Sequence, residues 1–288
     1  MNTAANDSAI TAREGTVLEL TADLSFAARQ RLAIADCTGA ARLWRLAFLL
    51  GWLDIKLRYR GSLLGPFWLT LSTAVMVGSL GVLYSTLFRI NVREYLPYLA
   101  LSQVLWTYLS GIVGDACTCF NQAEAIIRSV RMPYSVHAIR TIVRNLLILG
   151  HNILVIFAVY AIFRIWPGWH IFLVLPGLAL WTVDSFAICL LLGAFCARFR
   201  DIPPIVGSIM QIAFFLTPII WKPEQLGHWQ SVLPLNPFYG VMDIVRAPLL
   251  GTSSSGIVWL SAIAYSMLLL GFTWLFFLRA RGRIAFWI

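Results

Sequence analysis

Two ionisable side chains, His151 and Asp184, stand inside long apolar runs of this 288-residue chain. A charged group inside a membrane is costly unless it is paired or hydrated, so such residues indicate either pairing or proton transfer. The two positions fall at similar depths on consecutive antiparallel segments, and we predict that their side chains are in contact inside a helical bundle. Because one pair makes no continuous proton relay, structural pairing is favoured over transport chemistry.

Two arginines, Arg140 and Arg144, precede His151 near the end of the same apolar run. Long basic side chains close to the end of a membrane span can extend their charged heads to the interface. We expect both arginines to reach the aqueous boundary in this way rather than to lie buried.

Signatures of catalysis and metal binding are absent from the sequence. The four histidines are scattered without the spacing of metal ligands. The five cysteines form no C-x-x-C pair, and free thiols are expected. No G-x-S-x-G nucleophile elbow is present. We therefore expect no catalytic residue, no metal site and no cofactor bound by this chain.

A nucleotide-binding signature is missing as well. A phosphate-binding loop needs the pattern G-x-x-x-x-G-K followed by Ser or Thr, in which the lysine reaches the terminal phosphates. The only lysines are Lys56 and Lys222, and neither lies in this pattern. If transport by this chain uses ATP, then ATP and Mg²⁺ must bind a separate ATPase subunit.

The composition is that of an integral membrane protein. Hydrophobic residues make up 59% of the chain and charged residues only 12%, and the mean hydropathy is +0.78. Soluble domains carry about 25% charged residues. Each apolar run is close to the roughly 20 residues that a spanning helix needs. We predict an all-α fold with six transmembrane helices, at residues 66–88, 96–114, 139–163, 171–197, 202–221 and 257–278.

Basic residues are distributed unequally between the two sides that six spans create. One side carries Lys56 and the arginines of residues 41–60, 121–144, 198–201 and 279–283, whereas the other holds only Arg89, Arg93, Arg164, Lys222 and Arg246. Short loops rich in Arg and Lys stay on the cytoplasmic side, so both termini are predicted to be cytoplasmic. The net charge of +9 thus flanks the spans, and nucleic acid is not an expected partner.

The N-terminal part divides into two segments before the six-span domain of residues 61–288. Residues 1–40 are expected to form a loosely folded cytoplasmic tail, with 16–24 as a weak strand candidate and 25–36 as a weak helix candidate. Residues 41–60 are too short to span and are bracketed by basic residues, which predicts an amphipathic helix at the interface. Its apolar stripe is Leu43, Leu46, Ala47, Leu50, Leu53 and Leu57.

The second cytoplasmic loop predicts a short helix over residues 121–132, ended by Pro133. Glu124 and Arg128 form a favourable i, i+4 pair. Apolar residues on the same helix need a cover, either a protein partner or the membrane surface. A helix folded back onto its own bundle is the alternative.

Two sequence strings resemble a known family. The first, which begins at Ala197, is ARFRDIPPIVGSIMQIAFFLTPIIW, and the second, which begins at Leu235, is LNPFYGVMDIVRAPLLG. A third string, which begins at Arg58 and reads RYRGSLLGPFWLTL, is similar to the entry of the same family into its first span. The family is the membrane subunit of polysaccharide-exporting ATP-binding-cassette transporters, which export O-antigen, capsule and teichoic-acid chains. The resemblance covers roughly residue 41 to the C-terminus.

This resemblance implies a set of functional positions. Residues 121–132 would be the coupling helix that docks on the ATPase, and residues 222–250 would form short re-entrant helices on the outer side. The candidate ATPase-coupling residues are Glu124, Arg128, Arg131, Met132, Arg198, Arg200 and Asp201. The candidate outer-gate residues are Pro218, Trp221, Asn236 and Pro237. Two copies of the chain and two copies of an ATP-binding-cassette ATPase would form the transporter.

A glycan chain moving through a pore is best held by aromatic rings, which bind sugar faces weakly and without register. Trp68, Tyr84, Phe214 and Phe215 are the channel-lining candidates. We expect a permease subunit that exports a lipid-linked polysaccharide across the inner (cytoplasmic) membrane, in contact with membrane lipids.

Two alternative functions are open. A membrane-embedded enzyme acting on polyprenyl-linked sugars would need a larger polar cluster. A gradient-driven carrier would need an inverted repeat or paired broken spans.

Overall fold

The computed structural model describes residues 25–288, so the strand candidate at 16–24 lies outside the described residues. The described part consists of helices and their connections and contains no strand. Five of its helices are long and apolar enough to cross a membrane. They are α3 (Phe67–Phe88), α4 (Val92–Thr118), α6 (Ser135–Phe163), α7 (Val174–Arg198) and α10 (Gly256–Ala280). The prediction of an all-α membrane protein is confirmed.

The remaining predicted span is shorter than expected. Helix α8 runs over Ile202–Leu216 and does not reach Trp221. Thr217 adopts an extended conformation, with φ −94° and ψ 138°, because the ring of the following Pro218 disfavours the helical region for the residue before it. Fifteen residues rise about 22 Å, less than the roughly 30 Å hydrocarbon core. The C-terminal part of this predicted span is therefore built from irregular backbone.

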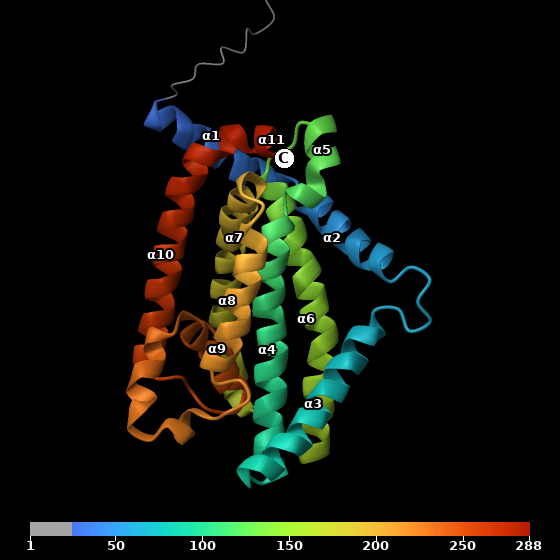
Figure 1. Ribbon diagram of the computed structural model, residues 1–288, viewed down its shortest axis with the longest axis vertical. Coiled ribbons are helices and arrows are strands. Elements are labelled where there is room, and N and C mark those ends of the chain that lie inside the picture. The colour runs from blue at the N-terminus through green and yellow to red at the C-terminus, as the bar shows by residue number, and fades with distance from the viewer. Residues whose placement is uncertain (1–24) are drawn as a thin grey trace, which may run out of the picture.

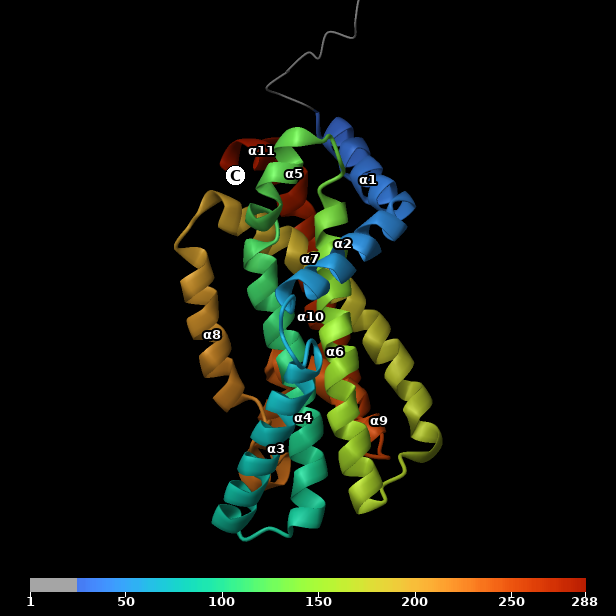
Figure 2. The ribbon, with the colours of Figure 1, turned by 90° about the vertical axis from the view of Figure 1, so that its right-hand side faces the viewer.

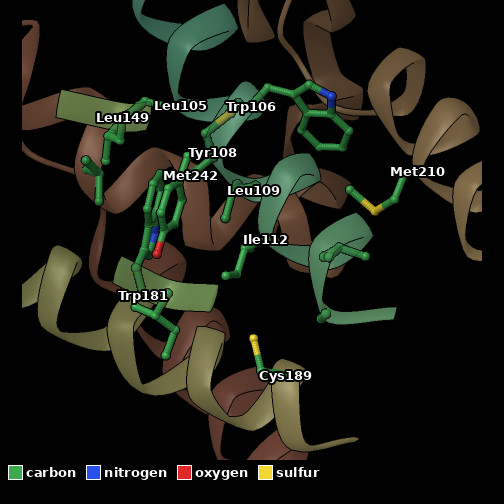
Figure 3. Close-up of a cluster of buried hydrophobic side chains, with 14 of the residues drawn as sticks. Leu105, Trp106, Tyr108, Leu109, Ile112, Leu149, Trp181, Cys189, Met210 and Met242 are labelled. Carbon is green, nitrogen blue, oxygen red and sulfur yellow. The ribbon is translucent and has the colours of Figure 1, made fainter. Parts of the chain in front are cut away.

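Helix α4 forms the centre of the bundle. It packs against α3, α6, α7, α8 and α9 (Pro237–Leu249), and most of its residues are buried. The Tyr108 ring of α4 stacks on the Trp181 ring of α7 at 5.2 Å between centroids, beside Leu109 and Ile112 (Figure 3). Helices α3 and α8 lie at the periphery with largely exposed side chains (Figure 2).

The short elements gather at the two ends of the bundle (Figure 1). Helix α1 (Phe26–Arg42), the turn η2 (Asn121–Ala123), α5 (Glu124–Ser129), η5 (Arg281–Arg283) and α11 (Ile284–Trp287) lie at one end. That end contains most of the arginine-rich loops. The η3 turn (Gly168–Leu173) and the turn between α3 and α4 lie toward the opposite end, and η4 (Pro223–Leu235) follows α8.

The described part of the predicted tail is helical. Residues from Phe26 onward form α1, capped by the Ser25 side chain, so the helix candidate at 25–36 was correct and longer than predicted. The buried Asp36 carboxylate accepts hydrogen bonds from the Ser135 backbone N–H and hydroxyl, at 3.0 and 2.7 Å, and pairs with Arg281 at 3.1 Å. Helix α1 is thereby attached to the first turn of α6 and to the end of α10.

Helix α2 (Trp44–Arg58) packs on α6 through a face that includes Ala47 of the predicted stripe, together with Gly51 and Ile55. Ala47, Gly51 and Ile55 are buried, whereas Leu53 and Leu57 are exposed. A Cβ atom on Gly51 would lie 2.8 Å from the Arg140 carbonyl oxygen, so only glycine permits this approach. Of the predicted stripe, Ala47 is buried, Leu43, Leu46 and Leu50 are half-buried, and Leu53 and Leu57 are exposed, so the first half of the stripe faces the protein.

Candidate functional site

The coupling segment is shorter than the predicted 121–132 helix. Its helical part comprises η2 and α5 and ends at Ser129. Val130 is extended, with φ −130° and ψ 129°, and begins a connection to Pro133 that includes Arg131 and Met132. Arg131 and Met132 therefore lie in the non-helical connection that follows α5 and not on the helix.

Helix α5 has two different faces. Ile127 packs against the core of the bundle, as the fold-back alternative required, whereas Glu124 and Arg128 are exposed. The predicted ion pair is confirmed, with 2.9 Å between Arg128 and Glu124. Arg128 also donates to the Ile288 carbonyl oxygen at 2.6 Å. One face of α5 is thus fixed to the bundle while the other offers charges to a partner.

The C-terminal helix α11 brings two distant coupling candidates to the same place. Ile284 is fully buried. Arg198, the last residue of α7, has its guanidinium 5.9 Å from the centroid of the Trp287 ring. Arg128 contacts the next residue, Ile288. Sequence reasoning did not assign any helix to residues 281–288, yet this element lies between the two loops expected to face the ATPase (Figure 1).

A partly buried network of ions, in which Arg144 is the buried member, lies directly beneath the coupling segment. Arg140 binds both oxygens of Asp54 in α2, at 2.8 and 2.6 Å. Arg144 pairs with Asp115 of α4 at 2.9 Å and donates to the Gln122 side chain of η2 at 3.1 Å. The expectation that both arginines extend to the interface was wrong, because acidic partners neutralise them inside the protein. Asp54, which interrupted the apolar pattern of α2, is one of those partners.

At the opposite side, polar groups compensate the irregular backbone after α8. Lipid provides no hydrogen bonds, so free carbonyl groups at this depth need protein donors. The Tyr95 hydroxyl donates to Ile220 O at 2.5 Å. The Tyr98 hydroxyl lies 2.8 Å from Pro218 O and 3.1 Å from Trp221 O. Two tyrosines of α4 therefore anchor the segment that contains the predicted gate residues.

Arg246 of α9 is the centre of this anchor, and the sequence reasoning missed it by counting it among the outer-loop charges. Its side chain is only 1% exposed. It donates to Pro218 O at 2.5 Å, to the Tyr98 hydroxyl at 2.9 Å and to Ser102 at 3.2 Å, and it pairs with Asp243 at 2.8 Å. The spacing of Asp243 and Arg246, one helical turn apart, was the available signal.

Asn236 connects the end of α8 to the start of α9. Its side-chain oxygen accepts from the Phe238 N–H at 3.0 Å and caps α9, and its side-chain nitrogen donates to the Thr217 hydroxyl at 3.1 Å. Pro237 occupies the first position of α9, where its missing N–H has no cost. The structure thus brings together three of the predicted gate residues, Pro218, Asn236 and Pro237. The fourth, Trp221, donates its indole N–H to Phe215 O at 3.0 Å.

An apolar groove runs along the outer half of α8. Its volume is about 790 Å³, and its walls come from α8, η4 and the start of α9. Phe215, Trp221, Asn236 and Pro237 line it. Phe215 is 62% exposed. Four of the predicted gate and channel residues therefore share one surface.

The other channel candidates lie elsewhere. Phe214 points toward α4, where its ring lies 5.9 Å from the ring of Trp106. Trp68 and Tyr84 belong to α3 and do not line the groove. Trp68 is 54% exposed, so its surface is open to lipid or to another subunit.

Residues 45–250, well over half of the chain, match the family described as ABC-2 type transporter. The chain belongs to the ABC-2 type transporter family. The match includes the coupling segment, the ion network and the anchored outer segment, whereas α1 and α10 lie outside it.

Curated relatives of this ABC-2 chain carry a common description. The O-antigen export system permease protein RfbA of Myxococcus xanthus is 24% identical over 197 residues, which is 67% of this chain and 76% of the relative. A protein of the same description from Klebsiella pneumoniae is 21% identical over 189 residues, 64% of this chain and 72% of the relative. The ABC-2 chain is thus a multi-pass transporter subunit and not an enzyme, and ATP hydrolysis belongs to a partner subunit.

The intramembrane pair predicted for this ABC-2 chain is wrong. His151 Nδ1 lies 2.7 Å from the Leu147 carbonyl oxygen of its own helix, and its ring meets Phe67 edge-on. Asp184 instead accepts a hydrogen bond from Ser266 of α10 at 2.8 Å. Two side chains on neighbouring helices must lie at similar depth to be in contact. Depth alone, however, does not determine which face of each helix carries the residue.

Proposed function

We propose that this ABC-2 subunit forms the membrane pathway for ATP-driven export of a lipid-linked polysaccharide. The observation that carries the proposal is the family match, together with relatives described as O-antigen export permease proteins. The aromatic and apolar groove beside α8 supports it, because aromatic surfaces suit the faces of sugar rings and the chain of a lipid anchor.

Two copies of the chain would form the pathway with two ATPase subunits. Helices α3 and α8 support this arrangement, because each exposes large apolar side chains over much of its length. On α3 these include Trp68, Val75 and Leu83, and on α8 they include Ile209, Ile212 and Phe215. A second copy would cover part of this surface and would convert an open groove into an enclosed path.

The subunit would lie in the inner (cytoplasmic) membrane with both termini in the cytoplasm. The arginine-rich end carries α5, α11 and the turn between α7 and α8, which gives a charged surface for the ATPase. The anchored segment with Pro218 and Asn236 would then lie toward the outer side, at the exit of the path. ABC-2 membership favours ATP over an ion gradient as the energy source and weighs against the carrier alternative.

The docking surface can be tested by charge reversal. Arg128→Glu combined with Arg131→Glu should weaken capture of the co-expressed ATP-binding-cassette subunit by about tenfold or more, because charge-assisted contacts of about 1.5–3 kcal/mol are lost. Capture would be measured by affinity purification in detergent. The melting temperature should fall by only a few degrees, since both arginines are exposed and the losses are an i, i+4 pair of about 0.2–0.5 kcal/mol and one hydrogen bond to Ile288 O of about 0.5–1.5 kcal/mol.

The matched control is Arg93→Glu, an exposed arginine at the other end of the bundle. It should leave ATPase capture unchanged. Equal capture by the double variant and by the unmodified chain would remove α5 and its following segment from the docking surface.

A further inference from the structure

A second apolar groove opens between α6 and α7, and we call it the α6–α7 groove. Its volume is about 650 Å³, within the roughly 300–1,000 Å³ of small-molecule sites. Leu149 of α6 and Val245 of α9 are buried members of its wall, whereas Phe157 of α6 and Leu175 of α7 also line it and are largely exposed. Because α6 and α7 are both long and apolar enough to span a membrane, the groove opens toward lipid.

The walls of the α6–α7 groove favour hydrocarbon as the occupant. Of the described wall residues, only Tyr160 and Trp166 carry a polar side-chain atom. The Tyr160 hydroxyl is already used, because it donates to Leu249 O at 2.5 Å. A polar molecule would lose hydrogen bonds with water on entry and gain none in return, whereas an acyl chain has none to lose.

The η3 end of the groove carries the signature of a membrane–water interface. Trp166 lines the groove two residues before η3 and is 88% exposed, and Trp169 of η3 is also exposed. Tryptophan rings are enriched at both interfaces of a membrane, at the level of the lipid headgroups. The η3 turn lies toward the end of the bundle opposite α5 (Figure 1). A lipid with its chain in the groove would therefore place its headgroup beside this turn.

Arg164, which precedes the wall residue Ile165, has a backbone conformation that glycine normally adopts. It ends α6 in the left-handed region, with φ 54° and ψ 46°, and the Ile165 N–H donates to Tyr160 O at 3.0 Å. Helices that end in this way usually carry glycine at this position, because a side chain is strained there. Among residues 25–288, only Arg89 and Arg164 have a positive φ without being glycine. A strained arginine in the place of glycine points to a use for its side chain.

The charge of Arg164 is available to a ligand. The side chain is exposed and forms no ion pair with an acidic residue of the described part of the chain. A guanidinium matches the geometry of a phosphate group and can donate two hydrogen bonds to it. A free arginine at the level of the headgroups, next to a groove for hydrocarbon, thus complements both parts of a phospholipid.

We propose that the α6–α7 groove holds one acyl chain of a bilayer glycerophospholipid, whose phosphate pairs with Arg164. Val245 and Leu249 of α9 line the groove, so the bound chain packs against the helix that carries Arg246. Binding of this lipid does not depend on what the subunit transports.

The test uses the full-length chain in phospholipid-free detergent micelles and does not require export activity. The probe is phosphatidylglycerol with a diazirine in one acyl chain, and the comparison probe is diacylglycerol with the same chain, which lacks the phosphate. Labelled peptides would be mapped by mass spectrometry. Saturable labelling of the groove segments of α6 and α7, stronger for the phospholipid by on the order of tenfold, supports the proposal.

Arg164→Gly removes the charge and the backbone strain together. Phospholipid labelling should fall to the level of diacylglycerol, while the melting temperature stays within a few degrees of the unmodified chain or rises. An arginine that only stabilised the end of α6 would give the opposite result, a lower melting temperature with unchanged labelling. Arg164→Lys keeps the charge and should retain most of the labelling. Arg89→Gly is the matched control, because Arg89 ends α3 in the same conformation and α3 contributes no residue to the groove walls. It should leave labelling unchanged.

Filling the groove tests where the chain binds. Ala161 is an exposed wall residue, and Ala161→Trp should abolish groove labelling by both probes. Ile162→Trp, at the neighbouring exposed position outside the walls, should not. Equal labelling by both probes, or phospholipid labelling unchanged in Arg164→Gly or Ala161→Trp, would overturn the proposal. Displacement of the probe by a polyprenyl phosphate at a lower concentration than by phosphatidylglycerol would also overturn it, because an isoprenoid lipid would then be the better occupant.

Discussion

Replacing Arg246 with methionine is expected to lower the melting temperature of the purified subunit by on the order of 10 °C. Methionine keeps the length of the side chain but removes five donors and the positive charge. Asp243 then loses its partner, and Pro218 O loses one of its donors. Removal of one member of a buried pair destabilises proteins by about 3–5 kcal/mol. A change of about 1 kcal/mol corresponds to roughly 2–4 °C in chains of comparable length.

Two variants separate the ion pair from simple loss of packing. Arg246→Met combined with Asp243→Asn should melt higher than Arg246→Met alone, because no unpaired carboxylate remains. Arg93→Met changes an exposed arginine and should stay within about 0.5 kcal/mol of the unmodified chain. If Arg246→Met melts at the same temperature as the unmodified subunit, the anchor does not stabilise the outer segment.

The second large effect concerns the network beneath the coupling segment. Asp54→Arg places a third guanidinium beside Arg140 and Arg144, where Asp54 now lies 2.6 and 3.6 Å from them. Repulsion at this partly buried site should detach α2 from α6 and disturb the Gln122 contact of η2. We expect a loss of at least about 3 kcal/mol in stability. We also expect less ATP-dependent transport for each ATP hydrolysed, because the coupling segment loses its support.

A charge exchange tests whether the pair itself is responsible. Arg140→Asp alone should also be damaging, but Asp54→Arg combined with Arg140→Asp rebuilds the pair in the opposite order. The double variant should therefore recover part of the melting temperature, and the interaction energy in this double-mutant cycle should be about 1–3 kcal/mol. Additive losses in the double variant would show that the two residues act independently.

The sequence was sufficient for the architecture because long apolar runs have few ways to fold in lipid. Five predicted spans correspond to long helices, and Glu124 and Arg128 form the expected pair. The early end of α8 was also available in principle, since Pro218 restricts Thr217. The continuous apolar run through Trp221 hid it, because hydropathy does not distinguish helix from anchored irregular backbone.

The site was harder to predict because it depends on which helix faces meet. Arg246 looked like an outer-loop charge, yet its partners Tyr98 and Ser102 are more than a hundred positions away in the sequence. Asp54 looked like an interruption of an apolar stripe until Arg140 was placed beside it. Pairing between residues distant in the sequence depends on how the helices pack. The local sequence pattern therefore does not predict it.

Transport in proteoliposomes tests the central claim most directly. The subunit would be reconstituted with its ATP-binding-cassette partner and a fluorescent lipid-linked polysaccharide, and transfer across the bilayer would be followed by quenching from an impermeant reagent. We predict transfer only when the subunit, the ATPase and ATP are all present, and none with a hydrolysis-deficient ATPase. Transfer by the subunit alone, or transfer that continues without ATP, would contradict the proposed function.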